Sequence, residues 1–277
     1  MSQMLLSIED LRVAFGYGAA SNEVLHGLNL TVNRGEAVGL VGESGSGKSV
    51  ASLAILRLLG SLGRITQGRI MFEGEDLALA TEAKMRSLRG SRISMIFQDP
   101  STALNPAFTI GVQLTDVIRA HRSLRGDAIR QEVHAVLDRV GFRDPHVVAR
   151  SYPHELSGGM KQRAMIAAAI VCEPGLLLAD EPTTALDVTV QAQIVELLRT
   201  LVKDMNIGLL FITHHLDLMA ELCTRTVVLK QGQVVEEGNV RQVFLQPSHP
   251  YTQKLMASIP RLPERTASPL TIVRGQP

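Results

Sequence analysis

The 277-residue sequence lacks several features that would assign it to a special class of protein. Its two cysteines, Cys172 and Cys223, are far apart and outside any metal-ligand spacing, so a reducing, cytoplasmic compartment is expected. No run of eighteen apolar residues is present, which excludes a membrane-spanning helix. The first residues have no basic segment before a long apolar one, so no signal peptide is expected.

The sequence also lacks any charge imbalance. There are 28 basic and 27 acidic residues without runs of Lys or Arg, so we expect no nucleic-acid partner. With 45% hydrophobic and 20% charged residues, the chain can bury a sizeable core. Its length allows one large domain or two closely joined ones.

A glycine-rich stretch between a strand and a helix is the strongest motif, Val38 to Ser49 with the sequence VGLVGESGSGKS. Lys48 and Ser49 open an apolar-patterned helix that extends to Leu59, which is the context of a phosphate-binding P-loop; an ordinary turn is the alternative. Lys48 can reach the β- and γ-phosphates, and the Ser49 hydroxyl can ligate Mg²⁺. The residues expected to bind ATP in this loop are Gly42, Glu43, Ser44, Gly45, Ser46, Gly47, Lys48, Ser49 and Val50.

A pair of acids closes a second buried strand, Leu176 to Asp180. Asp180 is expected at the carboxyl end of this strand, where it can hold Mg²⁺, usually through water. Glu181 follows and can polarise an attacking water. The alternative is an acid pair that merely ends a strand, but a phosphate loop in the same parallel sheet favours the catalytic interpretation.

A Ser-Gly-Gly segment precedes another helix, at Leu156 to Met160. Ser157 is a favourable N-cap and the glycines leave amides free at a helix start, which predicts a second anion site; an ordinary capped helix is the alternative. One chain then has two phosphate-binding helix starts but one carboxylate pair. The economical solution is a dimer, in which this second site closes over the nucleotide of the opposite subunit.

Apolar strands alternate with helices, which predicts an α/β fold with a mostly parallel sheet, the P-loop NTPase core. Alternation over 6–15 and 28–32, with a further strand at 69–72, predicts an antiparallel β subdomain at the N-terminus. The segment 225–237 is expected to form a hairpin with Gln231-Gly232 at its turn.

Helical spacing over 110–124 and 128–140 predicts an α-helical subdomain inserted between core strands. The expected units are an ATPase domain over 1–245 with the helical subdomain at about 99–155, and a tail over 246–277 with a brief helix at 252–258 and extended chain beyond.

Over residues 6–245 the sequence resembles the nucleotide-binding subunit of an ABC transporter. The motifs match in order and spacing: Walker A at 42–49, the signature at 156–160, and Walker B at 176–180 followed by the catalytic Glu181. The resemblance implies ATP and Mg²⁺ as cofactors. It also implies that the signature, Leu156, Ser157, Gly158, Gly159 and Met160, binds the γ-phosphate of the partner's ATP through Ser157 and the glycines.

Further roles are implied by the same resemblance. Gln98, in the Q-loop, would contact Mg²⁺ or the attacking water, and His214, the switch histidine, would contact the γ-phosphate. Asp187, in the D-loop, would link the two sites. Phe15 is expected to stack on adenine, with Tyr17 as runner-up and a plain core aromatic as the alternative. The implied catalytic set is Lys48, Gln98, Glu181 and His214, and the implied Mg²⁺ set is Ser49, Gln98 and Asp180.

Two positions depart from the family pattern. Met160 stands where Gln is commoner in the signature, and His215 follows His214 where Asp is usual. The phosphate-binding positions of the signature are unaffected, so we expect function to survive. Adjacent histidines point in different directions, so we do not expect His214 and His215 to form a metal site.

A narrower resemblance connects the chain to importers of dipeptides, oligopeptides and nickel. It rests on QDPSTALNP at 98–106, SYPHE at 151–155 and HPY at 249–251. Many peptide members carry a cysteine-rich tail with an iron–sulfur cluster; those cysteines are absent up to Pro277, so no cluster is expected and nickel or metallophore transport stays open.

The resemblance implies a peripheral ATPase on the cytoplasmic face of the inner membrane. Its expected partners are a homologous ATPase subunit (as homo- or heterodimer), two integral membrane permeases and an extracytoplasmic solute-binding protein. Three alternatives stay open: a soluble ABC-type ATPase of DNA repair or translation, a regulatory module without turnover, and an exporter subunit.

Overall fold

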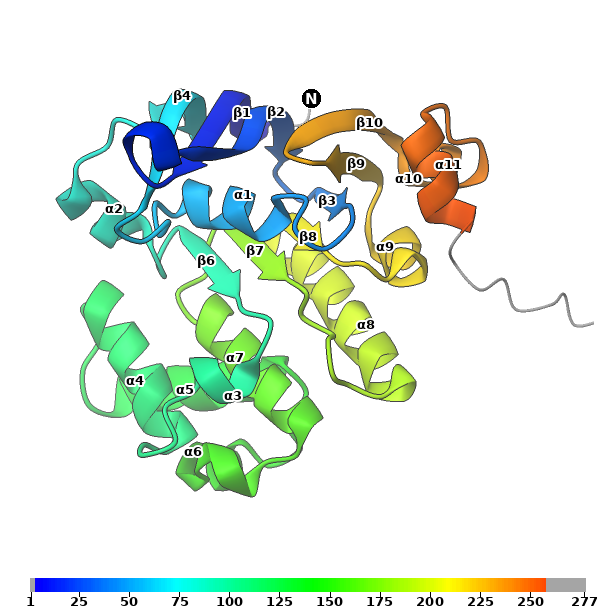
Figure 1. Ribbon diagram of the computed structural model, residues 1–277. Helices are drawn as coiled ribbons and strands as arrows, with labels where there is room; N and C mark the ends of the chain where they lie inside the picture. The colour runs from blue at the N-terminus through cyan, green and yellow to red at the C-terminus, as the bar shows by residue number, and fades with distance from the viewer. Residues whose placement is uncertain (1–2, 258–277) are drawn as a thin grey trace, which may run out of the picture.

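The computed structural model describes residues 3–257, which form two sheets with helices around them (Figure 1). The antiparallel sheet has the order β2-β1-β4-β5 and the larger sheet the order β10-β9-β3-β8-β7-β6. The strands of the first are β1 (Met4–Phe15), β2 (Asn22–Asn33), β4 (Gly63–Phe72) and β5 (Glu75–Asp76). Those of the second are β3 (Ala37–Val41), β6 (Ile93–Ile96), β7 (Leu176–Asp180), β8 (Gly208–Ile212), β9 (Arg225–Lys230) and β10 (Gln233–Asn239).

The larger sheet is parallel apart from β10, and its central strands are fully buried. Alternate side chains therefore enter two different cores: Leu209 and Phe211 pack on one face of β8, and Leu210 and Ile212 on the other. The antiparallel β9–β10 hairpin turns at Gln231-Gly232, both with positive φ. The predictions of a mostly parallel sheet, an antiparallel N-terminal sheet and this hairpin are confirmed.

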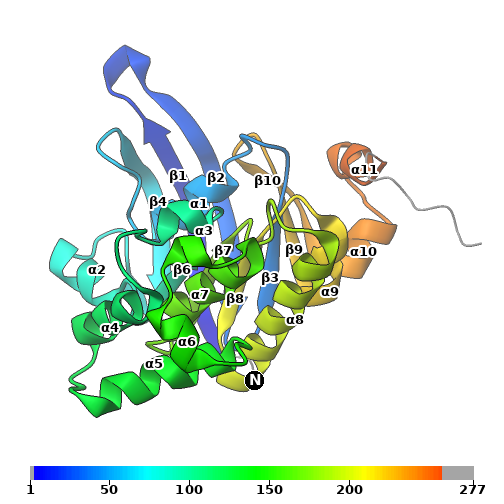
Figure 2. The same ribbon diagram turned by 90° about the horizontal axis from the view of Figure 1, so that it is seen from below.

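Each face of the larger sheet is covered by a different layer. The antiparallel sheet and the helices α1 (Lys48–Ile55) and α2 (Glu82–Leu88) cover one face. The opposite face carries α7 (Gly158–Ile170), α8 (Val188–Met205) and α9 (Leu216–Leu222), as Figures 1 and 2 show. The loop between β3 and α1 therefore lies at the carboxyl end of a central strand, where the chain leaves the sheet for the layer that contains α1.

A helical lobe follows β6 and lies beside α7 (Figure 1). Its helices are α3 (Pro100–Ala103), α4 (Ile110–His121), α5 (Asp127–Arg139) and α6 (Pro145–Arg150), followed by the 3₁₀ turn Pro153–Glu155. The helical spacing expected over 128–140 is explained by one buried face of α5: Ile129, Val133, Val136 and Leu137 all join the core that continues under the sheet. The chain ends with α10 (Val240–Leu245) and α11 (Pro250–Ala257).

Several element ends differ from the sequence predictions. Strand β2 begins at Asn22 instead of at the expected Leu28, because Asn22 pairs with Phe15 of β1. Strand β4 begins at Gly63 instead of at the expected Arg69, because Gly63 also pairs with Phe15. Helix α1 ends at Ile55 instead of near Leu59, since Arg57 adopts a left-handed conformation (φ 52°). The helix expected at 252–258 begins at Pro250; Ser258 and the expected extended chain lie outside the described residues.

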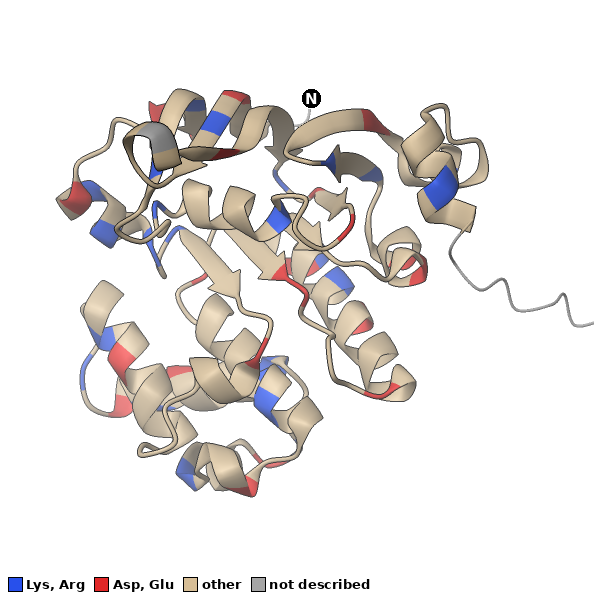
Figure 3. Ribbon diagram, in the orientation of Figure 1, with Lys and Arg blue, Asp and Glu red and all other residues tan. Residues whose placement is uncertain are grey.

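Basic and acidic positions are interspersed over both sheets and the helical lobe (Figure 3), in line with the balanced composition. Within residues 3–257, none of the helices is both long and apolar enough to span a bilayer.

Candidate functional site

The phosphate loop connects the buried strand β3 to α1. Gly47 precedes the helix with φ 103°, a conformation that favours glycine. Gly42 lies so close to β9 that a Cβ there would stand 2.1 Å from the carbonyl oxygen of Leu229. The hairpin turn supports the loop as well, because Gly232 N–H donates to the Ser46 carbonyl at 2.9 Å. Glycine is thus favoured at position 47 by the backbone conformation and required at position 42 by close packing against β9.

Lys48 is buried inside this loop, with an exposed fraction of 7%. Its ammonium donates to the carbonyl oxygens of Gly42 and Glu43, both at 2.8 Å. Burial lowers the pKa of Lys48, while Glu181 and Asp180 oppose that shift. The cation therefore faces the acid pair from within the loop.

Asp180 ends β7 and is 8% exposed. Burial raises the pKa of its carboxyl group, and a hydrogen bond from the Ser49 side chain opposes the shift. Its Oδ1 has no hydrogen-bond partner among residues 3–257. A buried carboxylate oxygen without a partner next to a hydroxyl is a donor set that a hard cation such as Mg²⁺ fits.

The carboxylate of Glu181 is held by three side chains. Gln98 Nε2 and Thr184 Oγ1 donate to Oε2 at 3.1 Å and 2.9 Å, and His214 Nδ1 lies 3.2 Å from Oε1. Glu181 itself has a left-handed backbone with φ 48°. The structure thus brings Gln98, Glu181 and His214 together as expected from the resemblance. Thr184 was missed, and its place in the loop after Walker B is the signal that could have found it.

A cavity of about 590 Å³ connects the loop to Glu181. It includes nine of the residues expected to act on ATP, together with Val24, which sequence reasoning missed. The lining residues are Val24, Ser44, Gly45, Gly47, Lys48, Ser49, Val50, Gln98, Glu181 and His214.

The signature segment does not line this cavity. Ser157 caps α7 by accepting a hydrogen bond from Met160 N–H, as predicted, and Ser157 and Gly158 are exposed. Asp187 caps α8 through Val190 N–H and is exposed too. The segment predicted to be a second anion site therefore exposes Ser157 and Gly158 to solvent.

The two aromatic candidates for adenine stacking lie at the end of β1 and just after it. Phe15 is partly buried against the core beneath the antiparallel sheet. Tyr17 is 64% exposed, and its hydroxyl donates to the carbonyl of Ser61. Neither lines the 590 Å³ cavity, so the choice between them stays a prediction.

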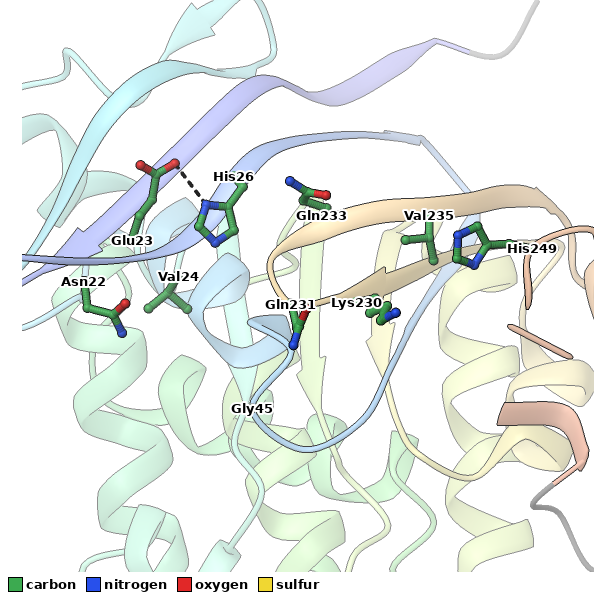
Figure 4. Close-up of a pocket in the computed structure, with 10 residues that line it drawn as sticks. All are labelled: Asn22, Glu23, Val24, His26, Gly45, Lys230, Gln231, Gln233, Val235 and His249. Atoms are coloured by element: carbon green, nitrogen blue, oxygen red, sulfur yellow. Dashed lines mark ion pairs between the residues drawn. The ribbon is translucent and has the colours of Figure 1, made fainter. Parts of the chain in front are cut away.

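A second cavity of about 640 Å³ adjoins the loop at Gly45 (Figure 4). Its walls come from β2, from the β9–β10 hairpin and from His249, which precedes α11. His26 Nδ1 of β2 lies 3.3 Å from a carboxylate oxygen of Glu23 there. Gly45 of the phosphate loop thus lines both cavities.

The chain matches two family models. The ABC transporter model matches residues 25–184, and the model of the C-terminal region of oligopeptide/dipeptide transporters matches residues 235–277. A Brucella ovis protein named for peptide import is 48% identical over 270 residues, covering 95% of this chain and 80% of that protein. The dipeptide transport ATP-binding protein DppD of Escherichia coli is 46% identical over 275 residues, with 98% and 84% covered.

Solved structures agree with these sequence matches. An ATP-binding cassette captured as a dimer after hydrolysis, with ADP and Pi, superposes with a TM-score of 0.75 at 25% identity, covering 86% of this chain and 99% of that one. The cbiO1 component of an ABC transporter complex of Clostridium perfringens has a TM-score of 0.74 at 29% identity, with 94% and 97% covered. The chain therefore belongs to the ABC transporter family, as one of its ATP-binding ATPase subunits.

Proposed function

We propose that this chain hydrolyses ATP at the interface of a head-to-tail dimer and thereby drives peptide import through membrane permeases. One observation carries the dimer proposal: the cavity with Lys48 and Glu181 lacks the signature segment, which faces outward with Ser157 exposed. A second subunit can supply it. The relative solved as a dimer with ADP and Pi supports this arrangement.

Glu181 is the proposed general base. Gln98, Thr184 and His214 hold both carboxylate oxygens, so the group is oriented before substrate arrives. Lys48 would compensate charge on the β- and γ-phosphates, and the Ser157 N-cap region of the partner would add amide donors from Gly158 and Gly159.

Mg²⁺ would be held by Ser49, Asp180 and Gln98, of which Ser49 and Gln98 line the cavity. The partnerless, buried Oδ1 of Asp180 supports this assignment. When bound, the ion would neutralise charge on the transferring phosphate. Phe15 would stack on adenine, and Asp187 would connect the two sites across the dimer.

The helical lobe is the proposed contact to two permease subunits. A mostly apolar groove of about 510 Å³ lies between it and the sheet, directly beside the Gln98 segment. Large apolar side chains remain exposed in the groove: Leu58, Phe97 and Phe108. A permease segment seated there would sense movement of Gln98. In this organisation residues 1–245 are the ATPase domain, with 99–155 as its inserted helical part, and 246–277 the tail.

Peptides are the proposed cargo, because the matched C-terminal model and the names of the relatives refer to oligopeptide, dipeptide or peptide transport. A solute-binding protein would deliver the cargo, and the ATPase would work at the cytoplasmic face of the membrane. Uptake of labelled dipeptide by cells carrying the whole transporter is the test. Uptake of nickel instead, competed by metallophore and not by peptide, would reassign the cargo.

Substitution of Glu181 tests the chemistry. Glu181→Gln should keep ATP binding while kcat falls by roughly 10²–10⁴, the usual contribution of a positioned base. Lys48→Ala should lose most of its ATP affinity. Phosphate release measures kcat of Glu181→Gln, and equilibrium binding of labelled ATP measures the affinity of both variants. Near-normal turnover in Glu181→Gln would remove this residue from the role of base.

A further inference from the structure

The C-terminal helix α11 brings an aromatic side chain to the phosphate loop. Tyr251, the second residue of the helix, is 6% exposed. Its hydroxyl oxygen accepts a hydrogen bond of 3.0 Å from the backbone N–H of Glu43. The two residues are 208 positions apart, so a segment assigned to the tail returns to Walker A.

Three neighbouring groups hold Tyr251 in place. The Lys230 ammonium at the end of β9 lies 5.2 Å from the centre of its ring. The backbone N–H of Tyr251 donates a hydrogen bond to His249 Nδ1 at 3.1 Å. Glu236 of β10 in turn accepts the N–H groups of Ser248 and His249, at 2.7 Å and 3.1 Å. The hairpin thus fixes the start of α11, and with it the position of the hydroxyl.

The backbone of Glu43 is held at both its N–H and its carbonyl oxygen. Its carbonyl oxygen accepts hydrogen bonds from the Lys48 ammonium at 2.8 Å and from Ser46 N–H at 3.1 Å. Tyr251 is the partner of its N–H. Lys48, which should bind phosphate, therefore contacts the carbonyl oxygen of Glu43, and the N–H of Glu43 is bound to Tyr251 of α11.

Glycine-rich loops lose much conformational freedom when they close around a ligand. A loop that is already fixed in the bound shape binds more tightly, because less ordering remains to be done. Gly42 is pressed against β9 and Glu43 is tied to α11, so the entry to the loop is fixed by two contacts from the last part of the described chain.

We propose that Tyr251 is a positioning residue for the Walker A loop, and that its hydrogen bond to Glu43 raises ATP affinity. The proposal rests on the proposed function, in which this loop holds ATP. By linkage, bound ATP stabilises the docking of α11 to the same extent that docked α11 favours ATP. The C-terminal segment is then part of the nucleotide site in each subunit.

The test is Tyr251→Phe in the full chain, which keeps the buried ring over Lys230 and removes the hydroxyl alone. We expect KM for ATP to rise about fivefold, the effect of one lost hydrogen bond, with kcat close to wild type. Amide hydrogen exchange at Glu43 should become faster without ATP. The thermal midpoint should change little, which separates positioning from general destabilisation.

Gln253→Met is the matched control. Gln253 lies on α11 as well, and its side chain donates to the Pro247 carbonyl at 3.0 Å without reaching the loop. Wild-type KM and Glu43 exchange are expected for it. An equal effect in both variants, or no effect of Tyr251→Phe, would overturn the proposal.

Lys48→Ala distinguishes a failure of the Tyr251 proposal from a failure of the proposed function. If Lys48→Ala loses ATP while Tyr251→Phe behaves as wild type, the positioning role fails and the proposed function stands. If Lys48→Ala binds ATP normally, the proposed function fails, and faster Glu43 exchange in Tyr251→Phe would then report a structural contact without a role in ATP binding, which also overturns the proposal.

Discussion

Glu181 combines backbone strain with tight restraint of its side chain. A non-glycine residue at φ 48° is costly and persists only where its surroundings hold it. The backbone N–H of Glu181 donates to the Ile212 carbonyl at 2.9 Å, and Gln98, Thr184 and His214 hold its carboxylate by contacts of 2.9 to 3.2 Å. A carboxylate fixed in this way needs little reorganisation when water is to be activated.

Thr184→Val should slow hydrolysis without weakening ATP binding. The change removes the hydroxyl that donates to Glu181 and keeps the shape of the side chain. One hydrogen bond is worth about 1 kcal/mol, so we expect kcat to fall about fivefold with unchanged KM. Steady-state phosphate release measures both constants.

The neighbouring Thr183→Val is the control for that variant. Its hydroxyl is buried and has no hydrogen-bond partner within the described part of the chain. A kcat close to wild type is expected. An equal loss in both variants would mean that the loop, and not the bond to Glu181, is responsible.

ATP affinity should fall with rising pH earlier than an ordinary lysine would allow. Burial lowers the pKa of Lys48 below 10.5, so the neutral amine, which cannot pair with phosphate, appears at lower pH. Bound ATP raises the same pKa by linkage. Titration of labelled-ATP binding from pH 7 upward measures the effect. In Lys48→Arg, which stays charged, the decline should be absent over that range; a matching decline would assign it to another group.

At the scale of single elements, glycine in β3 permits close packing of α9. A Cβ on Gly39 would stand 2.4 Å from Met219 Sδ, and Met219 is fully buried. The fully buried strand therefore depends on the absence of one side chain. Because β3 leads directly into the phosphate loop, the packing of Gly39 against Met219 also positions the start of that loop.

Gly39→Ala should lower the free energy of unfolding by about 1–3 kcal/mol through overpacking. Met219→Ala should be destabilising by about 2–5 kcal/mol because it leaves a cavity. In the double variant the two losses should be clearly less than additive, because removing the Met219 side chain makes room for the new Cβ, and the new Cβ fills part of the cavity. Denaturant unfolding of the four proteins measures the cycle, and simple additivity would show that the two residues do not clash.

Elements and site residues were predictable where the signal is local. The phosphate loop, the acid pair and the Ser157 cap each occupy one contiguous segment at a strand end or helix start. The start of β2 depends on pairing with β1, and the end of α1 on the backbone of Arg57, neither of which has a local pattern. Tyr251 could not be found from sequence spacing, because its contact spans 208 positions.

For the whole molecule, the outward-facing signature predicts that ATP joins two chains. Glu181→Gln should form a dimer when ATP is added, because the slow variant accumulates the closed state. Adding Ser157→Arg removes the N-cap of α7 and places a bulky side chain in the space of the partner's phosphate, so it should abolish the dimer while leaving ATP binding intact. Size-exclusion chromatography with light scattering separates the two states; a dimer that survives Ser157→Arg would contradict the proposed interface.

The order of strands in the larger sheet has a consequence for biosynthesis. Strand β3 precedes the phosphate loop, yet its neighbours on both sides, β8 and β9, begin at Gly208 and Arg225. A nascent chain that has left the ribosome up to the helical lobe therefore holds a Walker A strand with no partner on either edge. Strand β6 is in the same position, because it pairs only with β7, which begins at Leu176. Both apolar strands are therefore without partners until most of the chain has been translated, and until then they are segments that a chaperone can shield.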